Sequence, residues 1–178
     1  MTAEAEEEEG VKGKKDCLPI VLGVLAVLLV IGTACGKKVY DGCPKKADGS
    51  LDCSNQDLEG LDLSDSEFKA TNLEGADFAG ANLEDADFDE KSLEGANFSG
   101  AKLKGAKLDE LVLRSADFTG ANLEVADLSE SDLQWANFTG ANLEGANLRR
   151  TVLNQSVLEG ANFSGTDLWD TDLSGTAL

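Results

Sequence analysis

The sequence predicts a solenoid, a chain wound into stacked coils, over residues 51–178. Three regularities lead to this prediction. From Leu58 to Leu178 every fifth residue, 25 in all, is Leu or Phe, with no insertion or deletion. Every glycine after Gly49 stands two positions after such a Leu or Phe, and Ala is the commonest residue two positions before it. Short repeats of this kind are typical of proteins in which each repeat contacts only its neighbours.

A period of five matches neither a helix, which advances about 100° per residue, nor a strand, which advances 180°. It fits one corner per repeat, because Leu or Phe, the next residue, Gly and Ala make a four-residue turn. Glycine then stands third, where a type II turn requires positive φ. Repeats with another residue there are predicted to use a turn without positive φ; examples are Asp65, Asp85, Glu90, Glu110, Arg150 and Gln155. The Ala and Leu or Phe positions should face inward and the other three outward.

Three stretches resemble the consensus of the pentapeptide-repeat family: AGANLEDADF (79–88), LEGANFSGAKLKGAKL (93–108) and FTGANLEGANL (138–148). The resemblance covers residues 51–178, which are 128 of the 178 residues. It implies an all-β fold, a right-handed quadrilateral β-helix with four pentapeptides, twenty residues, in each coil.

A second period of twenty supports this architecture independently. Phe78, Phe98, Phe118 and Phe138 are spaced twenty apart and should stack on one face, and a second face should be formed by Leu at 73, 93, 113, 133, 153 and 173. With coils about 4.8 Å apart, about six coils make a rod roughly 30 Å long.

The segment before the repeats predicts attachment to a membrane. Residues 1–17 are charged and without periodicity, which is typical of disorder, whereas residues 18–35 carry no charge. As a helix they would extend about 27 Å, close to the ~30 Å hydrocarbon core. We expect a retained single-pass anchor with the repeats on the extracytoplasmic side; a lipoprotein signal ending at Cys35 and a cleaved signal peptide are the alternatives. Lysines on both sides leave the orientation open.

Residues 36–50 form a predicted linker and N-terminal cap. Cys43 and Cys53 are ten residues apart, and Cys53 occupies an inward position of the repeat register. We expect a Cys43–Cys53 disulfide if the compartment is oxidising; two free buried thiols are the alternative. A zinc site is not expected, because the chain has no histidine and no paired C-x₂-C units.

A few residues break the repeat. Val112 and Val152, which are forty apart, and Val157 stand where Asp or Asn is usual, and Trp135 and Trp169 fall on outward positions. We predict an apolar contact surface that includes Val112, Val152, Trp135, Trp169 and Leu178; scattered exposed apolar residues are the alternative. The end at Leu173 and Leu178 also predicts end-to-end dimerisation. Lys91 stands in an Ala position and predicts a local bulge. Leu61 and Leu111 also stand in Ala positions, where their side chains are larger than the usual residue.

The charge pattern argues against catalysis. Residues 51–178 contain 26 Asp and Glu against 8 Lys and Arg, a net charge of −18 that should face solvent. Without histidine, nucleophile–histidine pairs are excluded, and on a convex rod no pocket desolvates a carboxylate. No catalytic, metal or cofactor residue is therefore predicted.

Two functions remain. The first is a membrane-tethered interaction or structural module whose protein partner the sequence does not identify. The second follows from the resemblance, since some pentapeptide-repeat proteins inhibit or protect DNA gyrase as acidic rods that imitate duplex DNA. Nucleic acid itself is not expected as a ligand, because phosphate binding requires Lys and Arg.

Overall fold

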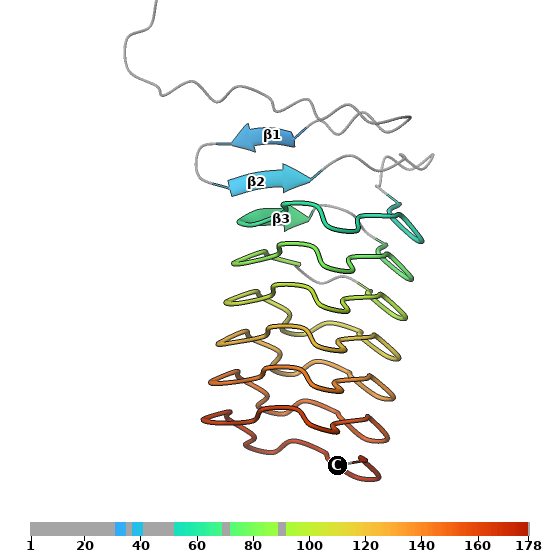
Figure 1. Cartoon of the computed structure of the whole chain (residues 1–178), viewed down its shortest axis with the longest axis vertical. Helices are drawn as coiled ribbons and strands as arrows, with labels where there is room; N and C mark the ends of the chain where they lie inside the picture. The colour runs from blue at the N-terminus through green and yellow to red at the C-terminus, as the bar shows by residue number, and fades with distance from the viewer. Residues whose placement is uncertain (1–30, 35–36, 41–51, 69–71, 89–91, 178) are drawn as a thin grey trace, which may run out of the picture.

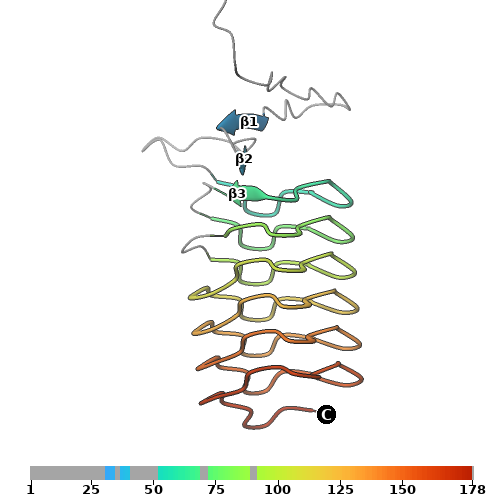
Figure 2. The ribbon, with the colours of Figure 1, turned by 90° about the vertical axis from the view of Figure 1, so that its left-hand side faces the viewer.

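The computed structural model describes residues 31–34, 37–40, 52–68, 72–88 and 92–177. The repeats wind into a rod of stacked coils, and the C-terminus lies at one end of the rod (Figures 1 and 2). Three strands are long enough to be named: β1 (Ile31–Ala34), β2 (Lys37–Tyr40) and β3 (Ser66–Phe68). The remaining sides of the coils are single β-bridges, all of them parallel.

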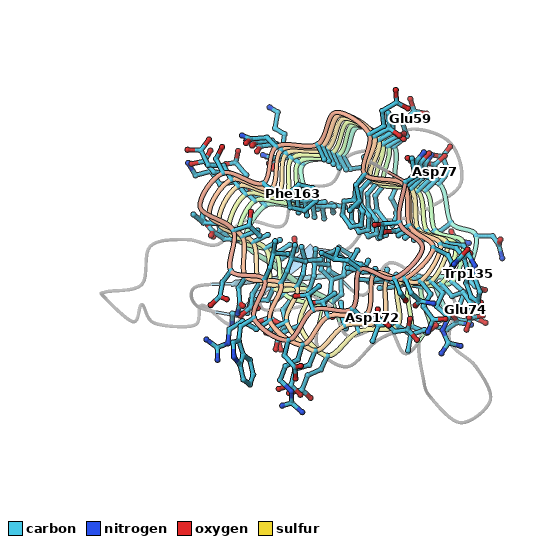
Figure 3. All side chains as sticks on the ribbon, turned by 90° about the horizontal axis from the view of Figure 1, so that it is seen from below. Glu59, Glu74, Asp77, Trp135, Phe163 and Asp172 are labelled. Carbon is cyan, nitrogen blue, oxygen red and sulfur yellow. The ribbon has the colours of Figure 1, made fainter. Side chains whose placement is uncertain are left out.

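Each coil contains twenty residues, because every bridge joins a residue to the one twenty positions later, for example Asp57 to Asp77 and Asn142 to Asn162. Seen along the rod, the chain follows four sides (Figure 3). We number the sides by their bridging residues. Side 1 carries residues 52, 72, 92, 112, 132, 152 and 172; side 2 begins at residue 57, side 3 at 62 and side 4 at 67. Corners 1 to 4 are the two-residue turns that follow each side.

The core confirms the predicted inward positions. The described Leu, Phe and Ala of these positions are buried almost throughout, up to the last coil. Phe98 stacks on Phe78 and on Phe118 with ring centroids 5.0 Å apart in both pairs, and Phe118 stacks on Phe138 at 4.8 Å. Phe88, from side 4, meets Phe98 edge-on at 6.1 Å across the interior. The stacked column predicted from the period of twenty is therefore present.

The corners correct one prediction. All described residues at multiples of five from 55 to 175 have positive φ, whether or not they are glycine. Asp65, Asp85, Glu110, Arg150 and Gln155 have φ between 54° and 63°, close to the value of 63° at Gly80. The prediction of a different turn for them is wrong, because a coil that must stack in register imposes one corner geometry on every repeat. Glu90 lies outside the described residues.

The outer Asp or Asn of the repeat closes each corner. At seventeen positions its Oδ1 accepts a hydrogen bond from the backbone N–H two residues later. This local bond is the reason for the Asp or Asn preference, which the sequence alone did not explain. It also holds the pKa of Asp172 below its usual value, because backbone and side-chain hydrogen bonds from Ser174 stabilise the carboxylate.

The oversized Leu111 is accommodated by the next coil. Leu111 is buried, and its N–H donates to Ser131 Oγ at 3.0 Å. The same hydroxyl donates to Leu108 O at 2.6 Å, so Ser131 bridges the two ends of the turn from 108 to 111. Lys91, the other predicted irregularity, lies outside the described residues.

At the N-terminal end, β1 pairs with β2 antiparallel and β2 pairs with β3 parallel. The helix predicted over residues 18–35 is therefore wrong for residues 31–34, which form β1. Gly32 and the β-branched Ile31 and Thr33 disfavour a helix and favour a strand that has a partner. Within the described ranges no helix is long and apolar enough to cross a lipid bilayer.

Cys53 is fully buried in the first coil and is disulfide-bonded. Cys43 and Cys35 lie outside the described residues, so the Cys43–Cys53 pairing stays a prediction. At the other end of the rod Leu168 and Leu173, which occupy inward positions, are partly exposed. Leu178 lies outside the described residues, and end-to-end dimerisation stays a prediction as well.

Candidate protein-contact surface

The predicted contact residues lie on or beside side 1. Val112 and Val152 both belong to this side, separated by Asp132, which bridges to each of them. Trp135 lies on corner 1, which follows side 1, and Trp169 lies on corner 4, which precedes it. Trp135 is 55% exposed, Trp169 57% and Val112 38%. The outward placement predicted from the five-residue register is therefore confirmed for these residues, while their role in contacts stays a prediction.

Trp135 occupies a strained position. It is the turn residue with positive φ, at 59°, where a bulky side chain is unusual and where an L-residue costs roughly 1–2 kcal/mol. Its N–H donates to Asn154 O at 3.3 Å, whereas the other corner-1 bonds of this type are 2.8–2.9 Å. Glycine fills the same corner at Gly75, Gly95 and Gly175. A tryptophan here is therefore not required by the fold.

The three valines of the outer position also depart from the local rule. A valine has no Oδ1, so the backbone N–H groups of residues 114, 154 and 159 lose the bond that Asp or Asn accepts at seventeen other positions. Such a hydrogen bond contributes about 1 kcal/mol. Val157, which is not one of the contact residues predicted from the sequence, is 36% exposed and lies on side 2 next to corner 1. The sequence signal was present, because Val157 breaks the same rule as Val112 and Val152.

These residues share a surface without charge. We define the corner-1 patch as Gln134, Trp135, Asn137, Val152, Asn154, Gln155 and Val157. None of its side chains is ionisable, and Ser174, Gly175 and Ala177 extend it toward the C-terminal end. Earlier coils present ionisable groups at the same corner, Glu74, Glu94 and Arg114, and Arg114 pairs with Asp132 at 2.6 Å beside the patch, which raises the pKa of Arg114. Figure 3 shows Trp135 and Glu74 projecting outward from this corner, with Asp172 on the adjoining side.

Two polar atoms near the patch lack partners. Among the described residues, Asn154 Oδ1 and Ser156 Oγ are the buried side-chain atoms without a hydrogen bond. Ser156 occupies an inward position, whereas Asn154 belongs to the outer surface of corner 1. A buried unpaired acceptor requires an explanation, such as water or a ligand group. Strain, lost hydrogen bonds and an unpaired acceptor thus gather at one corner.

Trp169 lies in different surroundings. The Arg149 guanidinium lies 4.8 Å from the centroid of the Trp169 ring and donates to Asp167 at 3.2 Å. Arg150 pairs with Glu130 at 2.7 Å on the same corner. Corner 4 is therefore charged and already paired within the chain, and the structure does not join Trp169 to the corner-1 patch.

The described residues contain no group of three or more Cys, His, Asp or Glu able to hold a metal ion. Their carboxylates lie on a convex surface and accept hydrogen bonds from their own turns. What the fold and this surface define is a repeat scaffold with an apolar corner.

Family comparisons agree with this class. The model described as "Pentapeptide repeats" matches residues 108–145 and 141–178, and the model described as "Pentapeptide repeat region" matches residues 52–118. The chain belongs to the pentapeptide-repeat family, whose fold is the right-handed quadrilateral β-helix and whose members are typically structural or interaction modules. The comparison with curated proteins gives no match.

Solved structures of the family are also similar. HetL, a pentapeptide repeat protein involved in heterocyst differentiation regulation from the cyanobacterium Nostoc sp. strain PCC 7120, is 30% identical over 70% of this chain and 71% of its own, with a TM-score of 0.37. A pentapeptide repeat protein from the Arabidopsis thaliana thylakoid lumen is 35% identical over 68% and 70%, with a TM-score of 0.38. QnrB1, a plasmid-mediated fluoroquinolone resistance protein, is 23% identical over 68% and 77%, with a TM-score of 0.43.

Proposed function

We propose that the protein is a non-enzymatic interaction module that contacts a protein partner through the corner-1 patch. One observation carries the proposal: Trp135, Val152 and Val157 are at least partly accessible apolar residues at positions where the fold prefers Gly, Asp or Asn. Departures from locally favourable choices tend to mark functional positions. The rod would gain stability from the usual residues, so contact with a partner accounts for the exception.

The absence of charge supports the same surface. Interface centres are poor in charged residues and rich in aromatic ones, and tryptophan is prominent among residues that dominate binding energy. The corner-1 patch has this composition, whereas the surrounding rod carries the net charge of −18. Val112 lies two coils away on side 1 and would be at the edge of the contact.

The test uses a photo-crosslinking amino acid placed in the full-length protein in cells. Position 134 lies in the patch; position 139 occupies the equivalent turn slot of the same coil on corner 2 and is the matched control. The proposal predicts covalent protein adducts from position 134 that greatly exceed those from position 139. Equal yields at both positions, or none at either, would contradict it.

We further propose that the apolar stretch 18–35 tethers the module to a membrane, either as an anchor or through a lipid on Cys35. Because β1 takes up residues 31–34, residues 18–30 remain for insertion, about 20 Å as a helix. This is short of the ~30 Å hydrocarbon core. Lipidation at Cys35 would follow cleavage before Cys35 and would remove β1, so the two forms of tethering differ in whether β1 is retained. Mass spectrometry of the purified protein tests this: either an intact chain that associates with membranes or a chain beginning at a lipidated Cys35 is expected, and an intact unmodified N-terminus with no membrane association would refute tethering.

A second candidate function is an acidic rod that imitates DNA and acts on DNA gyrase or another DNA-binding protein. The charge favours it, since 26 acidic residues in the repeats stand against 8 basic ones. A gyrase supercoiling assay separates the two candidates. The DNA-imitating rod would inhibit supercoiling at micromolar protein, and this inhibition would be lost when acidic residues of sides 2 and 4 are neutralised. The interaction module predicts no inhibition of supercoiling.

A further inference from the structure

The two unpaired buried atoms near corner 1 belong to one three-residue motif. Asn154, Gln155 and Ser156 form an Asn-x-Ser sequence, and the unpaired atoms are Asn154 Oδ1 and Ser156 Oγ. Asn-x-Ser with x other than Pro is the acceptor sequence for N-linked glycosylation. We propose that Asn154 Nδ2 carries an N-linked glycan, attached as the chain enters an oxidising compartment. This modification site goes beyond the protein contact.

The Ser156 hydroxyl has no bonding role in the fold. Ser156 is buried at an inward position, in the column that holds Ala76, Ala96, Ala116 and Ala136 in earlier coils. Four other inward hydroxyls donate to a backbone carbonyl 23 positions earlier at 2.6–2.9 Å, those of Ser131, Thr151, Thr166 and Thr171. Ser156 makes no such bond, so burying its hydroxyl costs free energy that Ala would avoid. The acceptor sequence requires a hydroxyl here and accounts for the serine.

The amide nitrogen of Asn154 is available to carry a sugar. Asn154 is the first turn residue of its corner, and the Ser156 N–H closes this turn by donating to Leu153 O at 3.1 Å. Oδ1 is the buried end of the Asn154 amide, so Nδ2 is the end that reaches solvent. No hydrogen bond of Nδ2 is found in the described part of the chain.

Three further acceptor sequences in the repeats differ from this one. They begin at Asn97, Asn137 and Asn162, which occupy outer positions of the sides. Each Nδ2 donates to a residue of the preceding coil, respectively Asp77 Oδ1 at 3.0 Å, Thr119 Oγ1 at 2.9 Å and Asn142 Oδ1 at 2.9 Å. A sugar on these nitrogens would crowd the ladder between coils that are about 4.8 Å apart. Asn154 is therefore the acceptor whose nitrogen the fold leaves unused.

The disulfide of Cys53 supports the compartment that the modification requires, because disulfides persist in oxidising, extracytoplasmic surroundings. The sugar donor there is an oligosaccharide joined to a lipid through a diphosphate. A bond forms between Asn154 Nδ2 and the anomeric carbon of the first sugar, while the bond from this carbon to the diphosphate breaks. The lipid diphosphate leaves with the electron pair, and the amide proton passes to a base of the transferring enzyme. Transfer precedes folding, so the later burial of Ser156 does not obstruct it.

The experiment examines the full-length protein isolated from its own cells. Protease fragments are analysed by mass spectrometry before and after treatment with an amidase that releases N-linked glycans and converts the acceptor Asn to Asp. We expect a glycan at position 154 and none at positions 97, 137 and 162. Asn154→Gln should abolish the glycan, whereas the matched control Asn162→Gln should leave it unchanged. An unmodified Asn154, or a glycan at one of the other three positions in its place, would overturn the proposal.

Substitutions of Ser156 separate modification from folding. Ser156→Ala should abolish the glycan. In the glycan-free Asn154→Gln background it should leave the unfolding midpoint equal or higher, because Ala fills the same column in earlier coils and the unpaired hydroxyl is removed. Ser156→Thr should keep the glycan, because Thr also satisfies the acceptor sequence. A glycan that persists in Ser156→Ala, or a lower unfolding midpoint, would contradict the role given to Ser156.

The glycan and the protein contact can fail independently. Asn154 adjoins Trp135, whose N–H donates to Asn154 O at 3.3 Å, so a glycan there shields part of the corner-1 patch. Asn154→Gln should therefore raise the yield of adducts from position 134 several-fold and leave position 139 unchanged. A glycan without adducts in Asn154→Gln would overturn the contact surface alone, and adducts with an unmodified Asn154 would overturn the glycan alone. A glycan whose removal leaves the adducts unchanged would overturn the shielding.

Discussion

Corner 1 and corner 2 have the same backbone conformation, but only corner 2 holds glycine in every described coil. On corner 2 the turn residue with positive φ is glycine in every described coil: Gly60, Gly80, Gly100, Gly120, Gly140 and Gly160. On corner 1 the same position holds Asn55, Gly75, Gly95, Ser115, Trp135, Gln155 and Gly175. Side-chain crowding does not explain the glycines, since a Cβ at Gly80, Gly100 or Gly120 would meet nothing within 4 Å.

The difference separates what the fold requires from what it tolerates. Positive φ favours glycine at every corner, and corner 2 follows that preference throughout. Corner 1 departs from it most strongly at Trp135, beside the two outer valines that lack the Asx hydrogen bond. A corner where several locally unfavourable choices coincide is better explained by contact with a partner than by folding.

The largest expected effect is a loss of folding stability on substitution in the core, which supports both corners. Phe98→Asp places a carboxylate inside a stacked aromatic column, where Phe98 is fully buried, and should cost more than about 4 kcal/mol. Urea unfolding followed by circular dichroism would show a chain without a cooperative transition. Phe98→Leu is the control and should stay folded. A soluble, cooperatively folding Phe98→Asp variant would contradict the inward assignment.

The corner preference is tested at Gly120. Gly120→Val should destabilise the rod by about 1–2 kcal/mol, because a β-branched residue is strained at positive φ while no atom obstructs the added side chain. Gly120→Asn should cost less, because Asn tolerates this conformation. Equal unfolding midpoints for the two variants would show that positive φ does not determine the glycine column.

The reverse substitution should stabilise. Val125 has φ 50° on corner 3, outside the corner-1 patch, so Val125→Gly removes strain without affecting the proposed contact. We expect a gain of up to about 1 kcal/mol. The loss of valine packing against the next coil reduces this gain, since a Cβ added at Gly145 would lie 3.2 Å from Val125 Cγ1. Crosslinking from position 134 should be unchanged. Clear destabilisation would mean that packing at this corner outweighs strain.

The smallest effect concerns Asp172, next to corner 1. Hydrogen bonds from Ser174 lower the pKa of Asp172 in the folded state. Its contribution is therefore present above the unfolded pKa and is lost as pH falls through the lower folded value. Asp172→Asn keeps the Oδ1 acceptor and removes this titration. The variant should lose slightly less stability than the parent protein as the pH falls through the acid range in which Asp172 titrates, and a greater loss would contradict the assignment.

Much of the fold follows from the five-residue period, because one corner per repeat and the inward Leu, Phe and Ala positions leave a coil as the arrangement that buries them. The positive φ of Asp65 and Arg150 could not be predicted from the sequence. The local preference of these residues argues against positive φ, and the need to stack the coils in register overrides that preference. The reason for the outer Asp or Asn required coordinates, because the hydrogen bond is a matter of side-chain geometry.

The candidate surface was only partly predictable. The register identified Val112, Val152, Trp135 and Trp169 as outward, but it did not show that Trp169 is engaged by Arg149 while Trp135 lies among uncharged residues. The end of the apolar segment was assigned to a helix from hydropathy alone. The pairing of residues 31–34 with 37–40 is a contact between separate segments, which hydropathy cannot reveal.

The most direct test of the central claim measures stability and crosslinking in the Val152→Asn, Val157→Asn double variant. The account predicts an unfolding free energy equal to the parent's or higher by up to about 2 kcal/mol, because two Asx hydrogen bonds are restored. It also predicts a clear loss of adducts from position 134. A double variant that is less stable and crosslinks as well as the parent would show that the valines serve the fold and that corner 1 is not a contact surface.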